Sequence, residues 1–436
     1  MCIISINISI INKFLARFKS VFSKKLFFTF SFVFYAMFKT YKRCSLYALY
    51  ENLNTVLSYD QIQYFFSDAN WSIDKLNALR LNLLHAQRST APSKDSLIAI
   101  DDTSCPKPYA KNTEGAHYQY CGTLGRKEVC NVAVFSSVVS KNKSIPIRFK
   151  SYLPAKEFYS RKDDPRFKSK LTLAKELLFE AKKSPNLSFI NQYNFDSWYA
   201  SVDFLETVHY ELNGVFFSEL KADRTVNFHH PVLKKTGFFK IEDLVKVFRG
   251  KYSHKFKRVH LHNKDGECRS YWTYSFNTML KDCSVPIKVV VVFGSWGKGD
   301  SAGFHALFTN NKTAHFLNII ENYLLRWGIE RVFQDMKEVC YFDHYQVRHQ
   351  EKIERWWTLS MLAWSFLYWV KQNAFLAKIM APSFKLQSLE DYRKAVEKML
   401  SLTSAIFTSN NPKQIKNLYK VISKNFLHQL KLKKAA

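Results

Sequence analysis

Three acidic residues occupy positions from which they could organise chemistry on a phosphate ester. Asp102 ends an apolar run, Asp196 follows a second strand-like segment, and Glu330 lies in a long helical pattern. If both strands end at one sheet edge and the helix crosses it, the carboxylates converge and repel one another unless cations lie between them. Oxygen ligands suit Mg²⁺ or Mn²⁺, and two ions about 4 Å apart can activate a water or 3′-hydroxyl and stabilise the leaving oxygen of a phosphodiester.

Each Asp alone also has a purely structural interpretation, because Asp is common in caps and turns. The pattern around Glu330 strengthens the chemical interpretation. On an ideal helix, four polar side chains fall within about 60° of arc, opposite an apolar face; they are Tyr323, Arg326, Glu330 and Lys337. This stripe is either a solvated face with ion pairs or a metal-binding Glu flanked by cations that hold DNA phosphates.

The elements that must position these acids follow from hydrophobic periodicity. Residues 1–92 have a mainly helical pattern. Three strands are expected between residues 96 and 154, followed by helix, strand, helix and strand up to residue 222. This order predicts a mixed α/β sheet with flanking helices, in which the first and fourth strands can be neighbours. A β-rich stretch then precedes the helix that carries Glu330.

We therefore predict five segments. They are a helical domain that binds DNA or dimerises (1–92), the first part of the α/β core (93–225), a β-rich insertion (226–310), the second part of the core (311–380) and a basic helical tail (381–436).

The charge of the chain indicates the class of its partner. There are 65 Lys and Arg against 36 Asp and Glu, a formal net charge of +29. Such an excess favours nucleic acid, with a basic genome bias or ribosome association as the alternative. None of the eight cysteines has C-x-x-C spacing. This spacing disfavours a zinc site and suits buried thiols in a reducing cytoplasm.

Residues 26–38, LFFTFSFVFYAMF, are as apolar as a membrane-spanning segment. They fall short of the roughly 20 residues that a spanning helix needs. The basic segment KTYKR follows instead of a small-residue cleavage site. We expect a buried helix and no membrane partner, with a membrane anchor as the alternative.

The spacing Tyr323-x2-Arg326-x3-Glu330-x6-Lys337 resembles the Y-R-E-K signature of DDE transposases in the IS four group of bacterial insertion sequences. Two other motifs agree in order and setting. The segment IAIDDTSCPK resembles the strand that bears the family's first Asp, and FDSWYASVDFL resembles the D-x-W-Y segment that bears the second. The resemblance covers roughly residues 95–370.

This resemblance implies an RNase H-like core interrupted by a β-rich insertion. It assigns metal binding and catalysis to Asp102, Asp196 and Glu330, with Asp102 favoured over Asp101 because it directly precedes Thr103. Two Mg²⁺ or Mn²⁺ ions are implied. Tyr323, Arg326 and Lys337 are implied to contact phosphates of the transposon end.

The implied activity is cutting of double-stranded transposon ends and joining of their 3′-hydroxyls to target DNA by a homodimer. The alternatives are an RNase H-like nuclease without strand transfer and an inactive DNA-binding derivative. Family relatives with a β insertion cut the second strand through a DNA hairpin, whose unstacked bases need an aromatic partner. We favour Trp296, in a Gly-rich loop, over Trp272, with loop packing as the alternative role.

Overall fold

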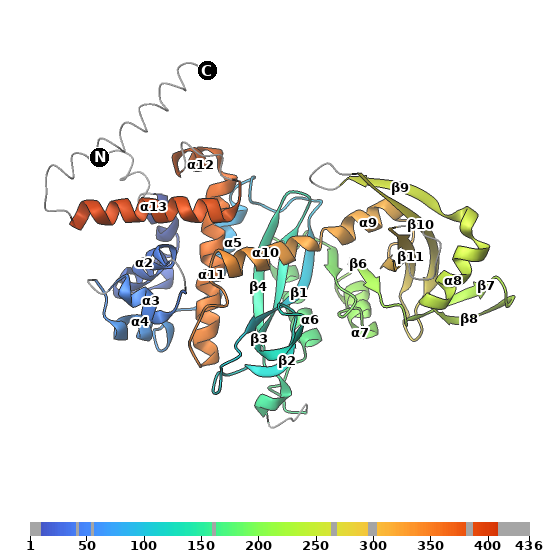
Figure 1. Cartoon of the computed structure of the whole chain (residues 1–436), viewed down its shortest axis with the longest axis horizontal. Helices are drawn as coiled ribbons and strands as arrows, with labels where there is room; N and C mark the ends of the chain where they lie inside the picture. The colour runs from blue at the N-terminus through green and yellow to red at the C-terminus, as the bar shows by residue number, and fades with distance from the viewer. Residues whose placement is uncertain are drawn as a thin grey trace, which may run out of the picture.

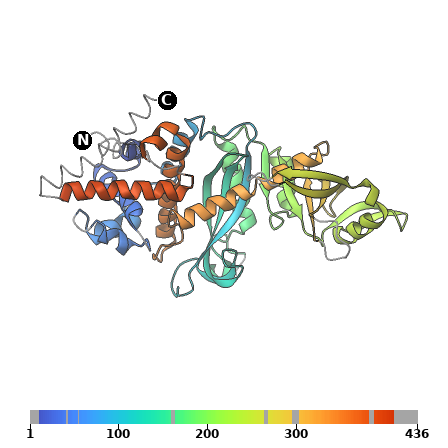
Figure 2. The same cartoon turned by 45° about the horizontal axis from the view of Figure 1, so that its top comes forward.

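The computed structural model describes residues 10–40, 43–53, 56–158, 163–262, 268–294, 303–380 and 387–408. A helical part, a long twisted sheet and a β-rich end follow one another along the long axis of the molecule (Figure 1, Figure 2). The amino-terminal and carboxy-terminal helices lie together at one end of this arrangement (Figure 1). The middle of the sheet therefore lies between the helical part and the β-rich end (Figure 1).

The helical part is held together by aromatic side chains. Its helices are α2 (Lys24–Lys39), α3 (Leu46–Glu51), α4 (Tyr59–Phe66), α5 (Ile73–His85), α11 (Gln350–Gln372), α12 (Ala374–Met380) and α13 (Leu389–Thr408). Phe34 and Phe38 of α2 both contact the ring of Phe366 in α11. The apolar segment at residues 26–38 is thus an internal helix, as predicted. No helix within the described ranges combines the length and apolar character needed to cross a membrane.

One sheet of ten strands forms the centre of the molecule. Its strands are β1 (Leu97–Pro106), β2 (His117–Cys121), β3 (Arg126–Val139), β4 (Ser144–Tyr152), β5 (Gln192–Phe195), β6 (Val215–Leu220), β9 (Lys257–His262), β10 (Cys268–Met279), β11 (Pro286–Phe293) and β12 (Phe304–Thr309). The order is β2-β3-β1-β5-β6-β12-β11-β10-β9, and β4 pairs with β3. The mixed sheet and the contact between β1 and β5 confirm the predicted pairing of the first strand with the one before Asp196.

Most of the predicted β-rich insertion is not a separate subdomain, because its strands are hydrogen-bonded into the central sheet. Strand β12 pairs antiparallel with β6, so β9 to β12 continue the central sheet. Among the described residues, β7 (Thr225–His230) and β8 (Lys235–Lys240) form a second sheet, beside α8 (Ile241–Lys251). The pairing gives β6 a neighbour on its far side, where its backbone groups would otherwise lack partners.

Helices cover both faces of the sheet centre. Helix α6 (Lys170–Lys183) packs on β3 and β4, whereas α10 (Trp327–Glu338) crosses β4 and β1 (Figure 1). Two short elements, α7 (Val202–Glu206) and α9 (Phe316–Leu324), complete this covering.

The single long helix predicted around Glu330 is in fact two helices, α9 and α10. The break lies at Leu325–Arg326, where Arg326 N bonds to the oxygen of Tyr323 at 3.0 Å and Gly328 N bonds to that of Leu325 at 2.9 Å. These shorter-range bonds replace the ordinary helical ones and end α9 before α10 begins. Tyr323 therefore lies on α9, while Glu330 and Lys337 lie on α10.

A buried arginine fastens the helical part to the sheet. Arg80 of α5 is fully buried, and its Nη2 donates to the oxygens of Pro146 and Ile147 at 2.8 and 2.7 Å. Its Nη1 donates to Ser365 Oγ of α11 at 3.0 Å. Burial lowers the pKa of Arg80 to about 9. One side chain thus joins α5, β4 and α11.

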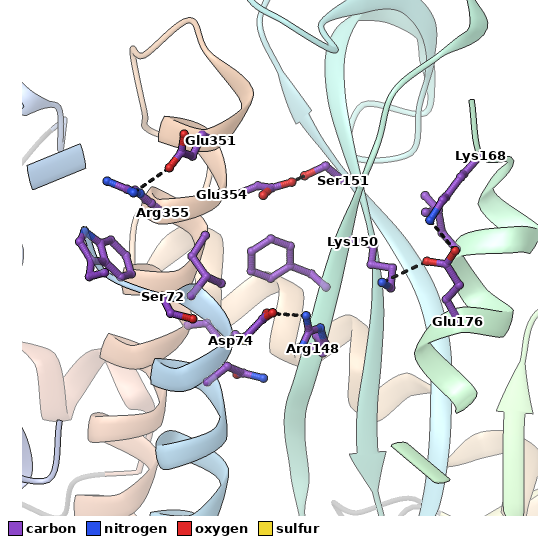
Figure 3. Close-up of a pocket in the computed structure, with 16 residues that line it drawn as sticks. Ser72, Asp74, Arg148, Lys150, Ser151, Lys168, Glu176, Glu351, Glu354 and Arg355 are labelled. Atoms are coloured by element: carbon purple, nitrogen blue, oxygen red, sulfur yellow. Dashed lines mark hydrogen bonds and ion pairs between the residues drawn. The ribbon is translucent and has the colours of Figure 1, made fainter. Parts of the chain in front are cut away.

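The groove beside this contact is lined by paired charges (Figure 3). Asp74 of α5 pairs with Arg148 of β4 at 2.5 Å, and Lys150 of β4 pairs with Glu176 of α6 at 3.0 Å. Because these charges neutralise one another, the groove offers little net charge to a polyanion. The first pair connects the helical part to the sheet, and the second connects α6 to it.

We predict that Arg80→Met lowers the free energy of unfolding by roughly 2–4 kcal/mol, because buried carbonyl oxygens lose their donors. Thermal denaturation followed by circular dichroism measures the effect. Lys75→Met, which removes an exposed cation from the same helix, is the matched control and should change stability by less than about 0.5 kcal/mol. Equal effects of the two changes would show that Arg80 is not a structural clamp.

Candidate active site

Three acidic residues lie in one row across neighbouring parallel strands. Strands β1 and β5 pair with Ile100 beside Phe195, so Asp101 and Asp196 lie side by side one residue further along. Strands β5 and β6 pair with Asn194 beside Phe217, so Glu219 lies level with Asp196. Residues that are level in a parallel ladder point to the same face of the sheet. The row therefore comprises Asp101, Asp196 and Glu219.

This row faces helices α9 and α10. Asn194 points to the same face as Asp196, because the two residues are two positions apart and side chains along a strand alternate between faces. Its amide nitrogen donates to the oxygen of Tyr323, at the end of α9, at 3.2 Å. The alternate residue Phe195 points the other way and contacts Phe204 of α7. The carboxylates thus lie beneath the helices that carry Arg326 and Glu330.

Arg326 connects the row to Glu330. Its Nη1 lies 2.9 Å from Asp101 Oδ2 and 2.7 Å from Glu330 Oε1. Burial lowers the pKa of Arg326, but the carboxylates, Asp101 first, more than offset this effect and raise it. Burial raises the pKa of Asp101 to about 8, while Arg326 lowers it and Asp196 raises it. A single cation therefore balances a cluster of several acids.

The structure places Asp102 differently from the sequence prediction. Its carboxylate accepts from Lys170 Nζ of α6 at 2.8 Å and from the buried Tyr199 hydroxyl at 3.0 Å. Because successive side chains on a strand alternate, Asp102 faces α6, while Asp101 faces Arg326 and Glu330. On β1 it is therefore Asp101 that is linked through Arg326 to Glu330. Which of the two binds metal stays a prediction.

Asp196 lies where the sequence predicts, directly after β5. Its Oδ1 accepts from the backbone nitrogens of Trp198 and Tyr199 at 2.9 and 3.3 Å, which fixes the carboxylate in a turn. Burial raises the pKa of Asp196, although these hydrogen bonds and Arg326 lower it. The cap role considered for an isolated Asp is therefore present, together with a position in the acidic row.

Tyr323 is directed into the protein. It is 8% exposed, and its hydroxyl donates to Glu219 Oε2 at 2.7 Å. The other oxygen of Glu219 lies 2.7 Å from His305 Nδ1 of β12. Burial raises the pKa of Tyr323, and the neighbouring Glu219 raises it further. Its predicted contact with DNA phosphate stays untested and would require this hydrogen bond to be exchanged.

Of the two remaining predicted DNA contacts, the structure describes Lys337 but not Trp296. Lys337 Nζ donates to the oxygen of Ser104 at 2.9 Å and to Thr123 Oγ1 at 2.6 Å, so it lies on the same side of β1 as Glu330 but holds the turn after β2. Trp296 lies outside the described residues, and its base-stacking role stays a prediction. Trp272 is half-buried in β10 and packs against the core.

Sequence reasoning did not identify Glu219, Lys170 or Tyr199 as site residues. Glu219 is a lone acid inside the apolar strand VFFSEL, and a charged residue in such a strand was a usable signal. Lys170 lies at the start of α6 within a basic run, which conceals it. Tyr199 was part of the D-x-W-Y segment, but only the fold brings its hydroxyl to Asp102.

The donor set suits a hard divalent cation. Carboxylate oxygens of Asp101 and Glu330 pair with one guanidinium, the charge of Asp196 acts on the same guanidinium, and burial raises the pKa of Asp101 and of Asp196. Within the described ranges no three acidic, His or Cys side chains already stand in ligating positions. Arg326 lies between two of the three acids, so a metal would have to displace it.

Comparison with known families bears on the same residues. A family described as DDE superfamily endonuclease matches residues 24–237, which include Asp101, Asp102 and Asp196. A second, described as Transposase DDE domain, matches residues 168–366, which include Asp196 and Glu330. No curated protein matches the chain. The two family matches overlap and together cover residues 24–366, which include the acidic row and the helices above it, so over these residues the chain is similar to DDE superfamily endonuclease and transposase domains.

Proposed function

We propose that the protein is a metal-dependent DNA transposase that cuts the ends of its own element and joins the 3′-hydroxyls to target DNA. The observation that carries the proposal is the row of Asp101 and Asp196 beneath Glu330, within the segments that match DDE domains. The net charge of +29 supports double-stranded DNA as the substrate. Membership of the IS four group, an RNase H-like core and a homodimer that pairs two ends belong to the same proposal.

In this proposal Asp101, Asp196 and Glu330 hold one or two Mg²⁺ or Mn²⁺ ions. Bound there, the ions supply activation of a water or 3′-hydroxyl and stabilisation of the leaving oxygen. Asp196 is held ready by the two backbone nitrogens that fix its carboxylate. Glu330 is more accessible than Asp101, with 35% of its side chain exposed against 15%.

Arg326 is proposed to act in two positions. Without metal it neutralises Asp101 and Glu330. When cations enter, the guanidinium loses this role and becomes free to bind a DNA phosphate, for which its planar donors are suited. Its Nε is buried with no hydrogen-bond partner among the described residues, so its present contacts do not use all of its donors.

Asp102 is proposed as a positioning residue on the reverse side of β1. Its contacts with Lys170 and Tyr199 fix the strand that carries Asp101 and attach it to α6 and to the turn after β5. An adjacent acid can thus support the site without binding the metal.

Substitution of the acids tests the metal assignment. We predict that Asp101→Asn, Asp196→Asn and Glu330→Gln each lower Mg²⁺-dependent cleavage of DNA carrying the element's ends by at least about 10³-fold, because several kcal/mol of charge stabilisation is lost. Binding of the same DNA should persist. Asp102→Asn should cost only about 10- to 100-fold. The reverse ranking of Asp101 and Asp102 would return the metal-binding role to Asp102.

Removal of Arg326 tests its competition with metal. In Arg326→Gln the acids lose their internal cation, so Mn²⁺ should bind at least about tenfold more tightly in the absence of DNA, a change of about 1.4 kcal/mol. Electron paramagnetic resonance of free Mn²⁺ measures this binding without any turnover. Arg331→Gln, on the exposed side of α10, is the matched control. Unchanged or weaker Mn²⁺ binding would show that Arg326 does not occupy the metal position.

Joining of DNA distinguishes a transposase from its alternatives. A labelled end with a free 3′-hydroxyl should be transferred covalently into a plasmid when Mg²⁺ is present, and the product is visible as labelled plasmid on a denaturing gel. Cleavage without transfer would identify an RNase H-like nuclease. DNA binding without either reaction would identify an inactive derivative.

A further inference from the structure

An exposed aromatic face lies on the hairpin of β2 and β3. Tyr118 and Tyr120 are 62% and 63% exposed, and they point to the same side because they alternate on β2. Their cross-strand partners on β3 are Val129 and the exposed Lys127. Isolated exposed aromatic residues are common on proteins, but two neighbouring rings beside a cation form a patch.

The opposite side of the hairpin is occupied by the protein. His117 pairs with Glu157 at 3.0 Å, the amide of Gln119 donates to the oxygen of Cys130 at 3.0 Å, and Cys121 is buried. This difference fixes the orientation of the hairpin, so the two tyrosines are held outward by the fold.

The hairpin is anchored beside the proposed active site. Thr123 and Gly122, in the turn after β2, bond to Ser104 of β1 at 2.6 and 3.2 Å. Lys337 of α10 holds both Ser104 and Thr123. Ser104 lies three residues, or about 10 Å, along β1 from Asp101. The tip of the hairpin is therefore held against β1 within a few residues of Asp101.

We propose that Tyr118, Tyr120 and Lys127 bind an unpaired segment of the DNA strand that the active site processes. The ligand in this inference rests on the proposed function. Rings two residues apart on a strand are about 7 Å apart, a spacing that suits two splayed, successive bases. Paired bases inside a duplex offer no free faces, whereas unpaired bases stack on aromatic side chains. Lys127 supplies a charge for the intervening phosphate.

A protein partner fits this face less well. Interface cores between proteins are depleted in Lys, and this patch has Lys127 directly opposite Tyr120. The overall charge of +29 also favours a polyanion. Single-stranded DNA satisfies both the aromatic and the cationic part of the face.

The test measures DNA binding in EDTA by fluorescence anisotropy, using a labelled duplex with a single-stranded tail and the same duplex with blunt ends. Tyr118→Ala and Tyr120→Ala should each weaken binding of the tailed duplex by about 5- to 150-fold, the range expected from loss of one base–ring stack. Binding of the blunt duplex should be unchanged. Tyr118→Phe and Tyr120→Phe should retain tail binding, since they keep the ring.

Lys127→Ala adds an independent measurement. It should lower the salt dependence of tail binding by about 0.7 in the logarithmic slope, whereas the tyrosine variants leave that slope unchanged. Tyr210→Ala is the matched control because Tyr210 is 58% exposed and lies between α7 and β6, outside the helical domain of residues 1–92. It should affect neither DNA.

Three results would overturn the inference. They are equal losses for tailed and blunt duplexes, no loss for either, and a change of oligomeric state in the alanine variants without DNA, which would identify a protein interface. Because the assay contains no metal, these results do not depend on catalysis. If the acid variants retain cleavage while the tail effect persists, only the proposed metal site fails.

Discussion

The register between β1, β5 and β6 is the constraint on which the site depends. Backbone hydrogen bonds fix which residues lie side by side, and this register brings Asp101, Asp196 and Glu219 into one row. A shift by one residue would turn each side chain to the other face. Three carboxylates in one row repel one another unless cations and hydrogen-bond donors contact them. Arg326, Tyr323 and His305 do so in this structure.

The break between α9 and α10 lies between the residues that contact the acidic row. A straight helix would carry the Tyr, Arg, Glu and Lys of the signature along one stripe. The break instead directs Tyr323 to Glu219 and Arg326 to Asp101. Gly328 allows the close approach, since a Cβ at this position would lie 2.4 Å from Ser144 Oγ. The start of helix α10 thereby packs closely on the end of β3 and the start of β4.

Contacts on both sides of the acidic row stabilise this arrangement. On one side Arg80 and the paired charges of the groove join the helical part to β4. On the other side β12 extends the sheet beyond β6 and supplies His305 to Glu219. Rigid support of this kind matters for a site that must hold like charges together, because small displacements weaken charge-assisted hydrogen bonds.

Local sequence information determined the elements and the types of residue in the site. Alternation, helical periodicity and capping residues were enough to predict the strands that carry Asp102 and precede Asp196, the buried helix at residues 26–38 and the apolar face of α10. Motif spacing predicted that Asp196, Glu330 and Arg326 take part in one chemistry. These features depend on residues close together in the chain, so the sequence alone expresses them.

Only the tertiary structure shows which of the adjacent Asp101 and Asp102 faces Arg326, since neighbours on a strand differ only in the face that they present. It also shows that β9 to β12 continue the central sheet, and that Glu219, Lys170 and Tyr199 contact residues of the candidate site. The pairing of Lys170 with Asp102 joins residues 68 positions apart, and that of Arg326 with Asp101 joins residues 225 apart. Contacts over such separations are set by strand register and helix packing, which no local pattern of residues encodes.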